Sequence, residues 1–388
     1  MTALDERSVD RLTRKPQREA WSDFVHTGPD TLAGRYLRRF WHPVCRSQDL
    51  ATGQLKPVRI MSEDFTIYRG ESGAAHAVAF RCAHRGTQLT AGWVQGENIR
   101  CFYHGWMYDP SGQCVEQPGE SEPFCQRIRI RSYPIHEYVG LIFLYLGEGD
   151  PPSPPRVPAL DNAEGLIENW REDWACNYFN RLENAPDLMH VPFVHSHHGT
   201  SVPTHIEARE TDFGFETRAR RGGSDWSDPT RFHMPNMNYF VGRAKAPEFE
   251  TGPRHNFMWR VPVDDERHMV FGAERVQVGP GDSDRYREWQ RSVEEELQRE
   301  PMDQVARRVL AGELPNRYVH ETRQWDTSSA QDYVVLMGQG IVADREHEHL
   351  GKEDVGVVLL RQIYVRELRA LAQGRPLKQW KWSADETA

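Results

Sequence analysis

Short runs of alternating apolar and polar residues fill the first third of the chain. From about Trp41, segments such as VRIMSEDFTIYRG, HAVAFRC and NIRCFYHGWMYD alternate in this way and are separated by glycine and proline. This pattern is typical of a small antiparallel β domain. The continuous apolar run YVGLIFLYL, at residues 138–146, predicts a buried strand because it is too short to cross a bilayer. The sequence SGQ at residues 111–113 predicts a turn between two strands.

A proline-rich segment, GEGDPPSPPRVP at residues 147–158, ends this pattern. Proline cannot continue a helix interior or a central strand, so the segment predicts a stiff linker. We therefore expect a small all-β domain at residues 41–150 and a second domain at residues 151–388. Residues 1–40 are expected to form an N-terminal helical segment that packs on the second domain.

The second domain mixes helix and strand patterns. The segment HNFMWRVPVDDERHMVFGAERV, at residues 255–276, predicts a hairpin whose turn is DDER. Residues 282–300 and 354–374 have helical periodicity with glycine-type stops. Residues 174–195 are compatible with a helix that its prolines bend or interrupt. The expected fold class is α+β, with a small β domain followed by a larger mixed domain.

Composition and charge exclude several classes of protein. The 388 residues carry 48 Lys plus Arg against 57 Asp plus Glu, a formal charge of −9, which argues against binding nucleic acid. The N-terminal sequence MTALDERSVDRLTRK lacks the apolar stretch of a secretory signal and no run is long enough to span a membrane, so we expect a cytoplasmic protein. Six cysteines in so long a chain do not indicate a disulfide scaffold. Four of them have no ligand-like spacing and are expected to be small buried residues: Cys45, Cys114, Cys125 and Cys176.

The other two cysteines belong to a Cys–His pattern within RCAHRGTQLTAGWVQGENIRCFYHGWMYD, residues 81–109. Zinc accepts two thiolates and two imidazoles, but zinc modules commonly place the cysteines in one knuckle and the histidines in another. In a Rieske [2Fe–2S] centre one iron takes two cysteines and the other takes two histidines. Two facing loops satisfy that demand here, with Cys82 and Cys101 on one iron, and His84 and His104 on the other. Zinc, or four residues without any metal, are the alternatives.

A second candidate metal site lies in NRLENAPDLMHVPFVH, residues 180–195. On a helix, Asp187 and His190 would lie one turn apart on a shared face, and Pro192 would have to swing His195 back toward them. Two histidines and one carboxylate on one side of Fe(II) leave the opposite side open for O₂ and substrate. Asn184 is a candidate supporting residue. The alternative is that all of these are ordinary surface or partly buried side chains.

Both motifs resemble those of a known family. CAHRG…CFYHGW resembles the C-x-H-R-G…C-x-x-H-G-W signature of Rieske iron–sulfur domains. Joined to the downstream motif, it resembles the α subunits of Rieske non-haem iron aromatic ring-hydroxylating oxygenases over essentially the whole chain. GRYLRRFWHPV, VPVDDERHMVF and AQDYVVLMGQGIVADREHEHLGKEDVGVVLLRQ resemble the phthalate-dioxygenase branch. Where members of that branch often carry a polar or acidic residue before M-G, this chain has Val334, Val335 and Leu336.

The resemblance implies a third iron ligand and a route for electrons. The ligand is Asp332, in the Q-D pattern of the branch, with Asp326 as the alternative. Asp187 is implied to bridge His190 to His104 of a neighbouring chain. The implied fold of the second domain is the helix-grip type, an antiparallel sheet wrapped around a long helix. The implied assembly is a trimer or a dimer of trimers.

The activity implied is that of an oxygenase with one [2Fe–2S] Rieske cluster and one mononuclear Fe(II). It would use O₂ to hydroxylate, or to O- or N-demethylate, an aromatic compound. The sequence has no nicotinamide or flavin fingerprint, so electrons are expected from a separate reductase that contains flavin and [2Fe–2S] and is fed by NAD(P)H. The expected substrate is an aromatic carboxylate, which an arginine such as Arg243 or Arg260 could hold through two hydrogen bonds. The rival classes are a Rieske electron-transfer protein without a second iron and a zinc-stabilised binding module.

Overall fold

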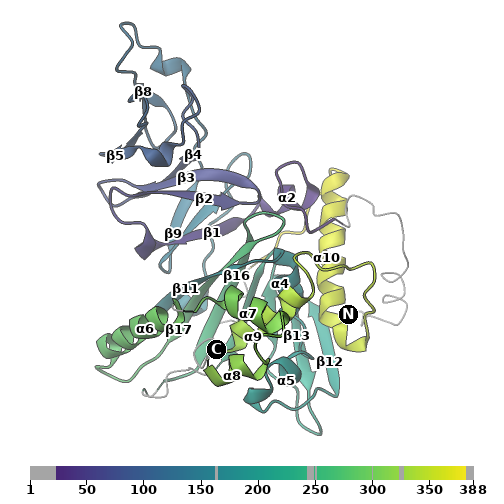
Figure 1. Cartoon of the computed structure of the whole chain (residues 1–388). Helices are drawn as coiled ribbons and strands as arrows, with labels where there is room; N and C mark the ends of the chain where they lie inside the picture. The colour runs from purple at the N-terminus through teal and green to yellow at the C-terminus, as the bar shows by residue number, and fades with distance from the viewer. Residues whose placement is uncertain are drawn as a thin grey trace.

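The computed structural model of the chain describes residues 23–161, 165–242, 249, 251–298, 300–322 and 327–381. Figure 1 shows a narrow β domain standing on a broader domain that holds a large sheet and most of the helices. The chain passes from one to the other through residues 146–157, which form no helix or strand. This linker is held in place where the Trp41 indole N–H donates to the carbonyl oxygen of Pro152 at 2.9 Å.

The β domain consists of three small antiparallel sheets, with strand orders β1-β10-β9, β2-β3-β4 and β5-β6-β7-β8. Strand β10 is LIFLY, and all five of its side chains are buried, as its apolar sequence predicts. The strands are β1 (Trp41–Arg46), β2 (Leu55–Ile60), β3 (Glu63–Arg69), β4 (Ala75–Ala79), β5 (Trp93–Gln95), β6 (Asn98–Arg100), β7 (Met107–Tyr108), β8 (Cys114–Glu116), β9 (Ile135–Tyr138) and β10 (Leu141–Tyr145).

The larger domain is built on one antiparallel sheet of seven strands, in the order β11-β17-β16-β15-β14-β13-β12. Two of its strands, β16 and β17, form a hairpin that pairs from Pro262 opposite His268 to His255 opposite Arg275. The strands are β11 (Leu166–Trp174), β12 (His205–Glu210), β13 (Gly214–Arg220), β14 (Thr230–His233), β15 (Met237–Gly242), β16 (Arg254–Pro262) and β17 (His268–Val276).

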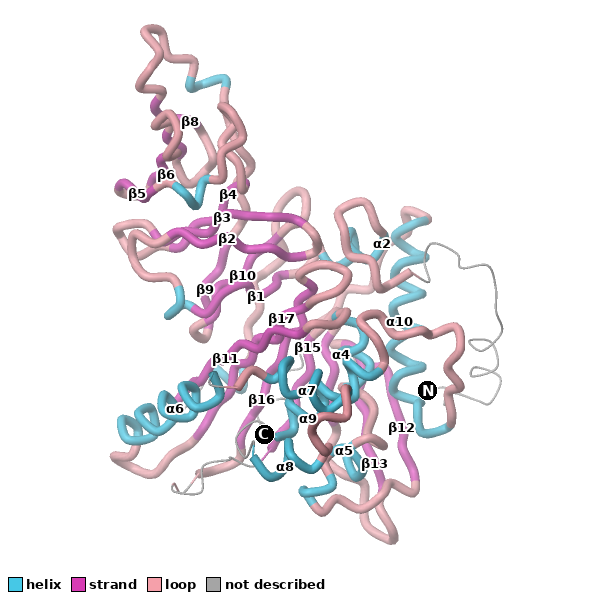
Figure 2. The backbone as a smooth tube through the Cα atoms, in the orientation of Figure 1, coloured by secondary structure: helices cyan, strands magenta, loops and turns pink. Residues whose placement is uncertain are grey.

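Helices cover one face of this sheet, as Figure 2 shows in cyan against magenta strands. The long helix α10 packs on β12, β13, α2 and α4. Its side chains Leu360, Tyr364 and Leu368 recur every fourth residue and are fully buried, which gives the helix its apolar face. The α-helices are α2 (Leu32–Leu37), α3 (Pro158–Asp161), α4 (Tyr178–Asn184), α5 (Val191–Val194), α6 (Ser283–Gln298), α7 (Met302–Leu310), α8 (Arg317–Thr322), α9 (Thr327–Gly338) and α10 (Val355–Ala372). The 3₁₀ helices are η2 (Ser47–Asp49), η3 (Leu89–Ala91), η4 (Cys125–Arg127), η5 (Ser196–His198) and η6 (Lys352–Asp354).

Consecutive side chains of β16 serve the two faces of the sheet. Trp259 faces the β domain, where its ring lies 5.6 Å, centroid to centroid, from that of Phe143 in β10. Arg260 faces the helices and donates to the side-chain oxygen of Asn238 in β15. The two domains are therefore in contact through the back of the sheet whose front carries the helices.

A buried histidine also joins the two domains. His42, in β1, donates from Nε2 to the carbonyl oxygen of Leu37 at 2.8 Å. Its Nδ1 accepts from the side-chain amide of Asn236 at 3.2 Å, in the turn between β14 and β15. Burial, helped by the charge of Arg38, lowers the pKa of His42 to about 4, so the ring is neutral.

Most of the predicted elements are confirmed. The hairpin at residues 255–276, the helices near 282–300 and 354–374, the buried strand and the turn at 111–113 are all present. The stretch 174–195 holds two helices, α4 and α5, separated by a turn around Pro186, so the interruption expected from its prolines is present, while Trp174 belongs to β11 rather than to a helix. Cys125 is half-buried rather than buried, since η4 follows the exposed segment 118–124.

The boundaries at residues 41 and 150 stay predictions. Residues 1–22 of the expected N-terminal segment lie outside the described residues. Within the part that the structure describes, no helix is both long and apolar enough to cross a membrane.

Candidate metal centres

The first centre lies in two matching loops at the tip of the β domain. One loop begins at Cys82, after β4, and the other at Cys101, between β6 and β7. In each loop a glycine N–H donates back to the cysteine carbonyl, at 2.9 Å from Gly86 and 3.0 Å from Gly105. Both glycines have positive φ, 76° and 72°, which side chains rarely tolerate. The turn chemistry therefore fixes the two loops in the same shape.

The two loops place their thiols inside and their imidazoles outside. Cys82 and Cys101 are buried, whereas His84 and His104 are exposed, with ring centroids 4.4 Å apart. Burial raises the pKa of the Cys101 thiol, and backbone N–H groups of Tyr103 and His104 counteract it. Two buried thiols opposite two facing imidazoles are the donor set of a Rieske cluster, and the residues present fit that group.

Two aromatic side chains support this tip. The Trp106 ring stacks on His84 with centroids 4.5 Å apart and an interplanar angle of 5°. The Tyr108 hydroxyl lies 3.2 Å from the Cys82 sulfur. Sequence reasoning did not single out Tyr108, which lies in the short strand β7 directly after the Cys101 loop.

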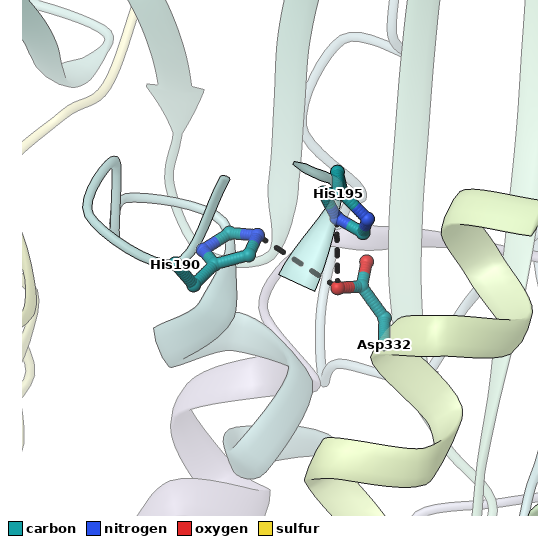
Figure 3. A group of neighbouring side chains, drawn as sticks. All are labelled: His190, His195 and Asp332. Atoms are coloured by element: carbon teal, nitrogen blue, oxygen red, sulfur yellow. Dashed lines mark ion pairs between the residues drawn. The ribbon is translucent and has the colours of Figure 1, made fainter. Parts of the chain in front are cut away.

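The second centre is formed by His190, His195 and Asp332, whose ligand atoms all lie within 4.8 Å of one another. His190 precedes α5, His195 follows it, and Asp332 projects from α9 toward both rings (Figure 3). One oxygen, Oδ1 of Asp332, lies 3.1 Å from Nε2 of His195 and 3.7 Å from Nε2 of His190. Two imidazoles and one carboxylate that converge on one point fit a mononuclear Fe(II).

Neighbouring side chains orient the two imidazoles. Nδ1 of His195 lies 3.0 Å from the side-chain oxygen of Gln331, so it carries the proton and leaves the lone pair of Nε2 facing Asp332. Nδ1 of His190 lies 3.5 Å from Oδ2 of Asp187. Burial lowers the pKa of His190, but Asp187 and Asp332 outweigh this, and the net shift is upward.

Asp187 reaches its place through a turn rather than along a helix. Helix α4 ends at Asn184, and Pro186, two residues later, has no backbone N–H with which to continue the helical hydrogen bonds. Oδ1 of Asp187 accepts from the backbone N–H groups of Met189 at 2.8 Å and His190 at 3.3 Å. The expected helical face shared by Asp187 and His190 is thus absent, but the turn still brings the carboxylate against the ring.

A buried arginine, which sequence reasoning missed, completes the surroundings of Asp332. Nη1 of Arg181 donates to Oδ2 of Asp332 at 2.8 Å and also to the side-chain oxygen of Asn184. Nδ2 of Asn184 lies 3.4 Å from Oδ1 of Asp332 and 3.5 Å from Nε2 of His190. Burial would raise the pKa of Asp332, but Arg181 and His195 hold it well below its usual range. The sequence offered one signal for this arginine. Arg181 precedes Asn184 by about one helical turn, so the two side chains lie on the same face of α4.

Two residues considered from the sequence lie outside the described residues. They are Asp326, the alternative ligand, and Arg243, one of the two candidate substrate arginines. The two centres themselves lie far apart within one chain. Figure 1 shows the tip near β5 and β8 at one end of the molecule and α5 at the other.

Comparisons with known proteins agree with these two centres. The family of the Rieske [2Fe-2S] domain matches residues 40–134. The chain is 30% identical over 371 residues to the 5,5'-dehydrodivanillate O-demethylase oxygenase subunit of Sphingobium sp., covering 91% of this chain and 81% of that one. It is 31% identical over 402 residues to the tert-butanol monooxygenase / tert-amyl alcohol desaturase oxygenase subunit of Aquincola tertiaricarbonis, covering 94% and 79%. It is 26% identical over 394 residues to the phthalate 4,5-dioxygenase oxygenase subunit of Pseudomonas putida, covering 89% and 84%.

A solved structure has the same fold. The terminal oxygenase of carbazole 1,9a-dioxygenase from Novosphingobium sp. KA1 superimposes with a TM-score of 0.64 at 19% identity. The match covers 93% of this chain and 98% of that one. The expected α+β arrangement, a small all-β domain followed by a domain with a large antiparallel sheet, is therefore confirmed.

Proposed function

We propose, from the premise that the chain belongs to the oxygenase subunits of the Rieske family, that it is the terminal oxygenase of a multicomponent system. In this role it uses O₂ and electrons from a separate protein to hydroxylate, or to O- or N-demethylate, an aromatic compound. The observation that carries the proposal is the convergence of His190, His195 and Asp332 in a chain that also carries the Cys–His tip.

The residues that would hold the two groups are those of the two centres. Cys82 and Cys101 would bind one iron of the [2Fe–2S] cluster, and His84 and His104 the other. His190, His195 and Asp332 would bind the mononuclear iron. When bound, the cluster supplies single electrons and the Fe(II) supplies the position at which O₂ reacts.

The chain's own residues prepare the mononuclear site. Gln331 fixes the proton of His195 on Nδ1, and Asp187 faces the corresponding nitrogen of His190. Burial of His195 and Asp332 keeps bulk water away from this side of the site. Arg181 holds Oδ2 of Asp332 and leaves Oδ1 directed toward the two histidines. These contacts hold the donor atoms in one orientation before any substrate arrives.

Electrons are proposed to pass between chains. The two centres lie at opposite ends of one chain, and the histidines of the tip are exposed while its cysteines are buried (Figure 1). Asp187 is only partly exposed and lies against His190, which suits a carboxylate that bridges to His104 of a neighbouring copy. This arrangement requires a homo-oligomer, for which a trimer or a dimer of trimers is proposed.

The electron donor is proposed to be a separate reductase that contains flavin and [2Fe–2S] and is fed by NAD(P)H. The proposed location is the cytoplasm, which the six cysteines without disulfide bonds favour. The names of two relatives, a dehydrodivanillate demethylase and a phthalate dioxygenase, favour an aromatic substrate. The name of the third favours a small branched alcohol, which is the competing substrate class.

The proposal is tested with purified protein, a surrogate reductase, and a panel of aromatic acids, neutral aromatic compounds and tert-butanol. We expect one more iron per chain than the two of the cluster, and O₂ uptake coupled to oxygenated or demethylated aromatic product. Coupled turnover of tert-butanol alone would replace the aromatic substrate by an alcohol. A protein with only the two cluster irons and no turnover would instead be an electron-transfer protein.

A further inference from the structure

One buried tryptophan lies close to the mononuclear centre. Trp174 ends β11, an edge strand of the large sheet, and is 1% exposed. The guanidinium carbon of Arg181 lies 4.7 Å from the centroid of its ring. Nη1 of the same guanidinium donates to Oδ2 of Asp332 at 2.8 Å. A single guanidinium group therefore connects the indole to a proposed iron ligand.

A second short path joins the same two places. Tyr333 follows Asp332 in α9, and its ring stacks on that of Trp174 with centroids 4.5 Å apart and an interplanar angle of 24°. The hydroxyl of Tyr333 accepts from the backbone N–H of Ala175 at 2.8 Å, which fixes the phenol beside the end of β11. The indole is thus in contact with the residue next to the ligand. Packed rings and short bonded connections of this kind allow an electron to move between the indole and the iron site.

The indole also has an acceptor for its proton. An indole nitrogen is a donor only, and Nε1 of Trp174 donates to Oε2 of Glu172 at 3.0 Å. This distance lies within the range over which a carboxylate can take a proton directly. Loss of an electron makes an indole N–H far more acidic, so the proton of an oxidised Trp174 would pass to Glu172.

The charge over the ring determines how the indole can be oxidised. A guanidinium over an aromatic face is attracted by the electrons of the ring, and removing one of these electrons turns the attraction into repulsion. In the buried interior this repulsion is stronger than in water. A radical cation is therefore unfavourable beside Arg181, and only oxidation with loss of the proton to Glu172 leaves the ring neutral. Weak oxidants should leave Trp174 intact for this reason.

We propose that Trp174 is a redox-active residue that gives an electron to the mononuclear centre when that centre is oxidised without substrate. The reduction of one molecule of hydrogen peroxide to water takes two electrons, of which Fe(II) gives one and the indole gives the other. The Nε1 proton passes to Glu172, and the protons that form water come from the solvent. A reductant such as ascorbate then returns an electron to the neutral indole radical, which takes its proton back from Glu172. This inference rests on the proposed iron site and adds a protective reaction to the oxygenase function.

A cavity gives a small reductant access to these rings. It has a volume of about 510 Å³, lies between the two domains, and is lined by Val58 of β2 together with Trp174 and Tyr333. Without an electron from the indole, the oxidising equivalent would remain beside His190 and His195, whose imidazoles it can oxidise. The expected benefit of Trp174 is therefore the survival of the two histidine ligands.

The test uses the full-length protein with both metals, an oxidised cluster and no substrate. The protein is mixed with hydrogen peroxide and frozen, electron paramagnetic resonance records organic radicals, and growth on ring-deuterated tryptophan identifies an indole radical by its line shape. Peptide mass spectrometry locates added oxygen. Trp174→Phe removes the electron donor, and Glu172→Gln keeps an acceptor oxygen that cannot take the proton. Trp170→Phe is the matched control, because Trp170 lies on the same face about 13 Å away along β11 and donates to Glu274 at 2.7 Å.

We expect the native protein to give a radical whose line shape changes with deuterated tryptophan, and to gain oxygen at Trp174. Trp174→Phe should lose this radical, and the added oxygen should move to His190 and His195. Glu172→Gln should also lose the radical, whereas Trp170→Phe should retain it. Ascorbate added with the peroxide should abolish both the radical and the added oxygen. Iron analysis and the visible spectrum of the cluster report that each variant is loaded and folded.

Several results would overturn the proposal. They are a radical that deuterated tryptophan does not change, a radical that persists in Trp174→Phe, and an equal loss in Trp170→Phe. A radical that persists in Glu172→Gln would overturn the proton transfer. The same radical in protein from which a chelator has removed the mononuclear iron would assign the oxidation to the cluster instead.

Two further measurements keep the outcome decisive. If Trp174→Phe does not fold, the isotope effect on the radical and the position of the added oxygen in the native protein answer the question. A native protein that binds only the irons of the cluster would refute the proposed function itself. Full iron content without an indole radical would refute this inference alone.

Discussion

Replacing Gln331 by leucine removes the hydrogen-bond acceptor that orients His195 and leaves the volume of the side chain nearly the same. Both side chains are buried, at 7% and 6% exposure, and the bond between them is 3.0 Å long. A metal needs the lone pair of Nε2, and therefore a proton on Nδ1. In the variant the Nδ1 proton has no partner. The imidazole can then adopt the other tautomer, with its proton on Nε2, which lies 3.1 Å from Oδ1 of Asp332.

The expected loss follows from that one bond. A buried hydrogen bond contributes about 0.5–1.5 kcal/mol net, and losing it from the metal-binding tautomer weakens metal affinity by up to about tenfold. Competition from the other tautomer adds to this, which places the total at about 10–100-fold, the range typical of outer-shell partners. Unfolding stability should fall by only about 1 kcal/mol.

The assay removes the mononuclear iron with a chelator, while the visible spectrum reports that the cluster remains. Fe(II) is then titrated back without oxygen and its dissociation constant is measured by calorimetry. Gln339→Leu is the matched control, because Gln339 lies exposed at the end of the same helix region. If Gln331→Leu binds Fe(II) as tightly as the native protein, this hydrogen bond does not orient His195 for a metal.

Two further predictions concern the mononuclear centre, and a third concerns the histidine between the two domains. His190→Ala or Asp332→Ala should lose the mononuclear iron and keep the spectrum of the cluster. If an Asp332 variant keeps its full iron content, another residue is the third ligand. Asp187→Asn should keep both metals, which iron analysis verifies, and slow single-turnover reduction of the mononuclear site by on the order of 100-fold; unchanged turnover would remove the bridge. Because the pKa of His42 is about 4 when folded and 6.5 ordinarily, the unfolded chain binds the extra proton between these values. Stability should therefore fall as the pH drops from 6.5 to 4, by up to about 3 kcal/mol, and denaturant midpoints of His42→Gln should depend less on pH in this window.

The cluster loops are the part of the molecule that the sequence predicts best. All four candidate ligands lie within one stretch, and their spacing together with two glycines determines a local shape that needs no distant contact. The spacing does not predict which side of the loops is buried. The position of the thiols inside and the imidazoles outside depends on packing around Trp106 and Tyr108.

The mononuclear centre is less accessible to sequence reasoning because it is assembled from distant segments. Asp332 was identified only by resemblance, and its approach to His195 results from the packing of α9 beside α5. Arg181 belongs to no sequence motif. Its role follows from the packing of α4 against α9, which lets its guanidinium donate to Asp332. The helical reading of Asp187 was wrong because periodicity does not reveal that a turn can replace a helix around Pro186.

The alternation of side chains along β16 constrains how this molecule can change. Trp259 packs against the β domain, and its neighbour Arg260 points into the interior beneath the helices. A single-residue insertion or deletion upstream in the strand would exchange these two positions, placing a guanidinium between the domains and an indole beneath the helices. Substitutions in β16 keep the register of the strand and can change single side chains on one face. Insertions or deletions within the strand would instead move buried side chains to the wrong face.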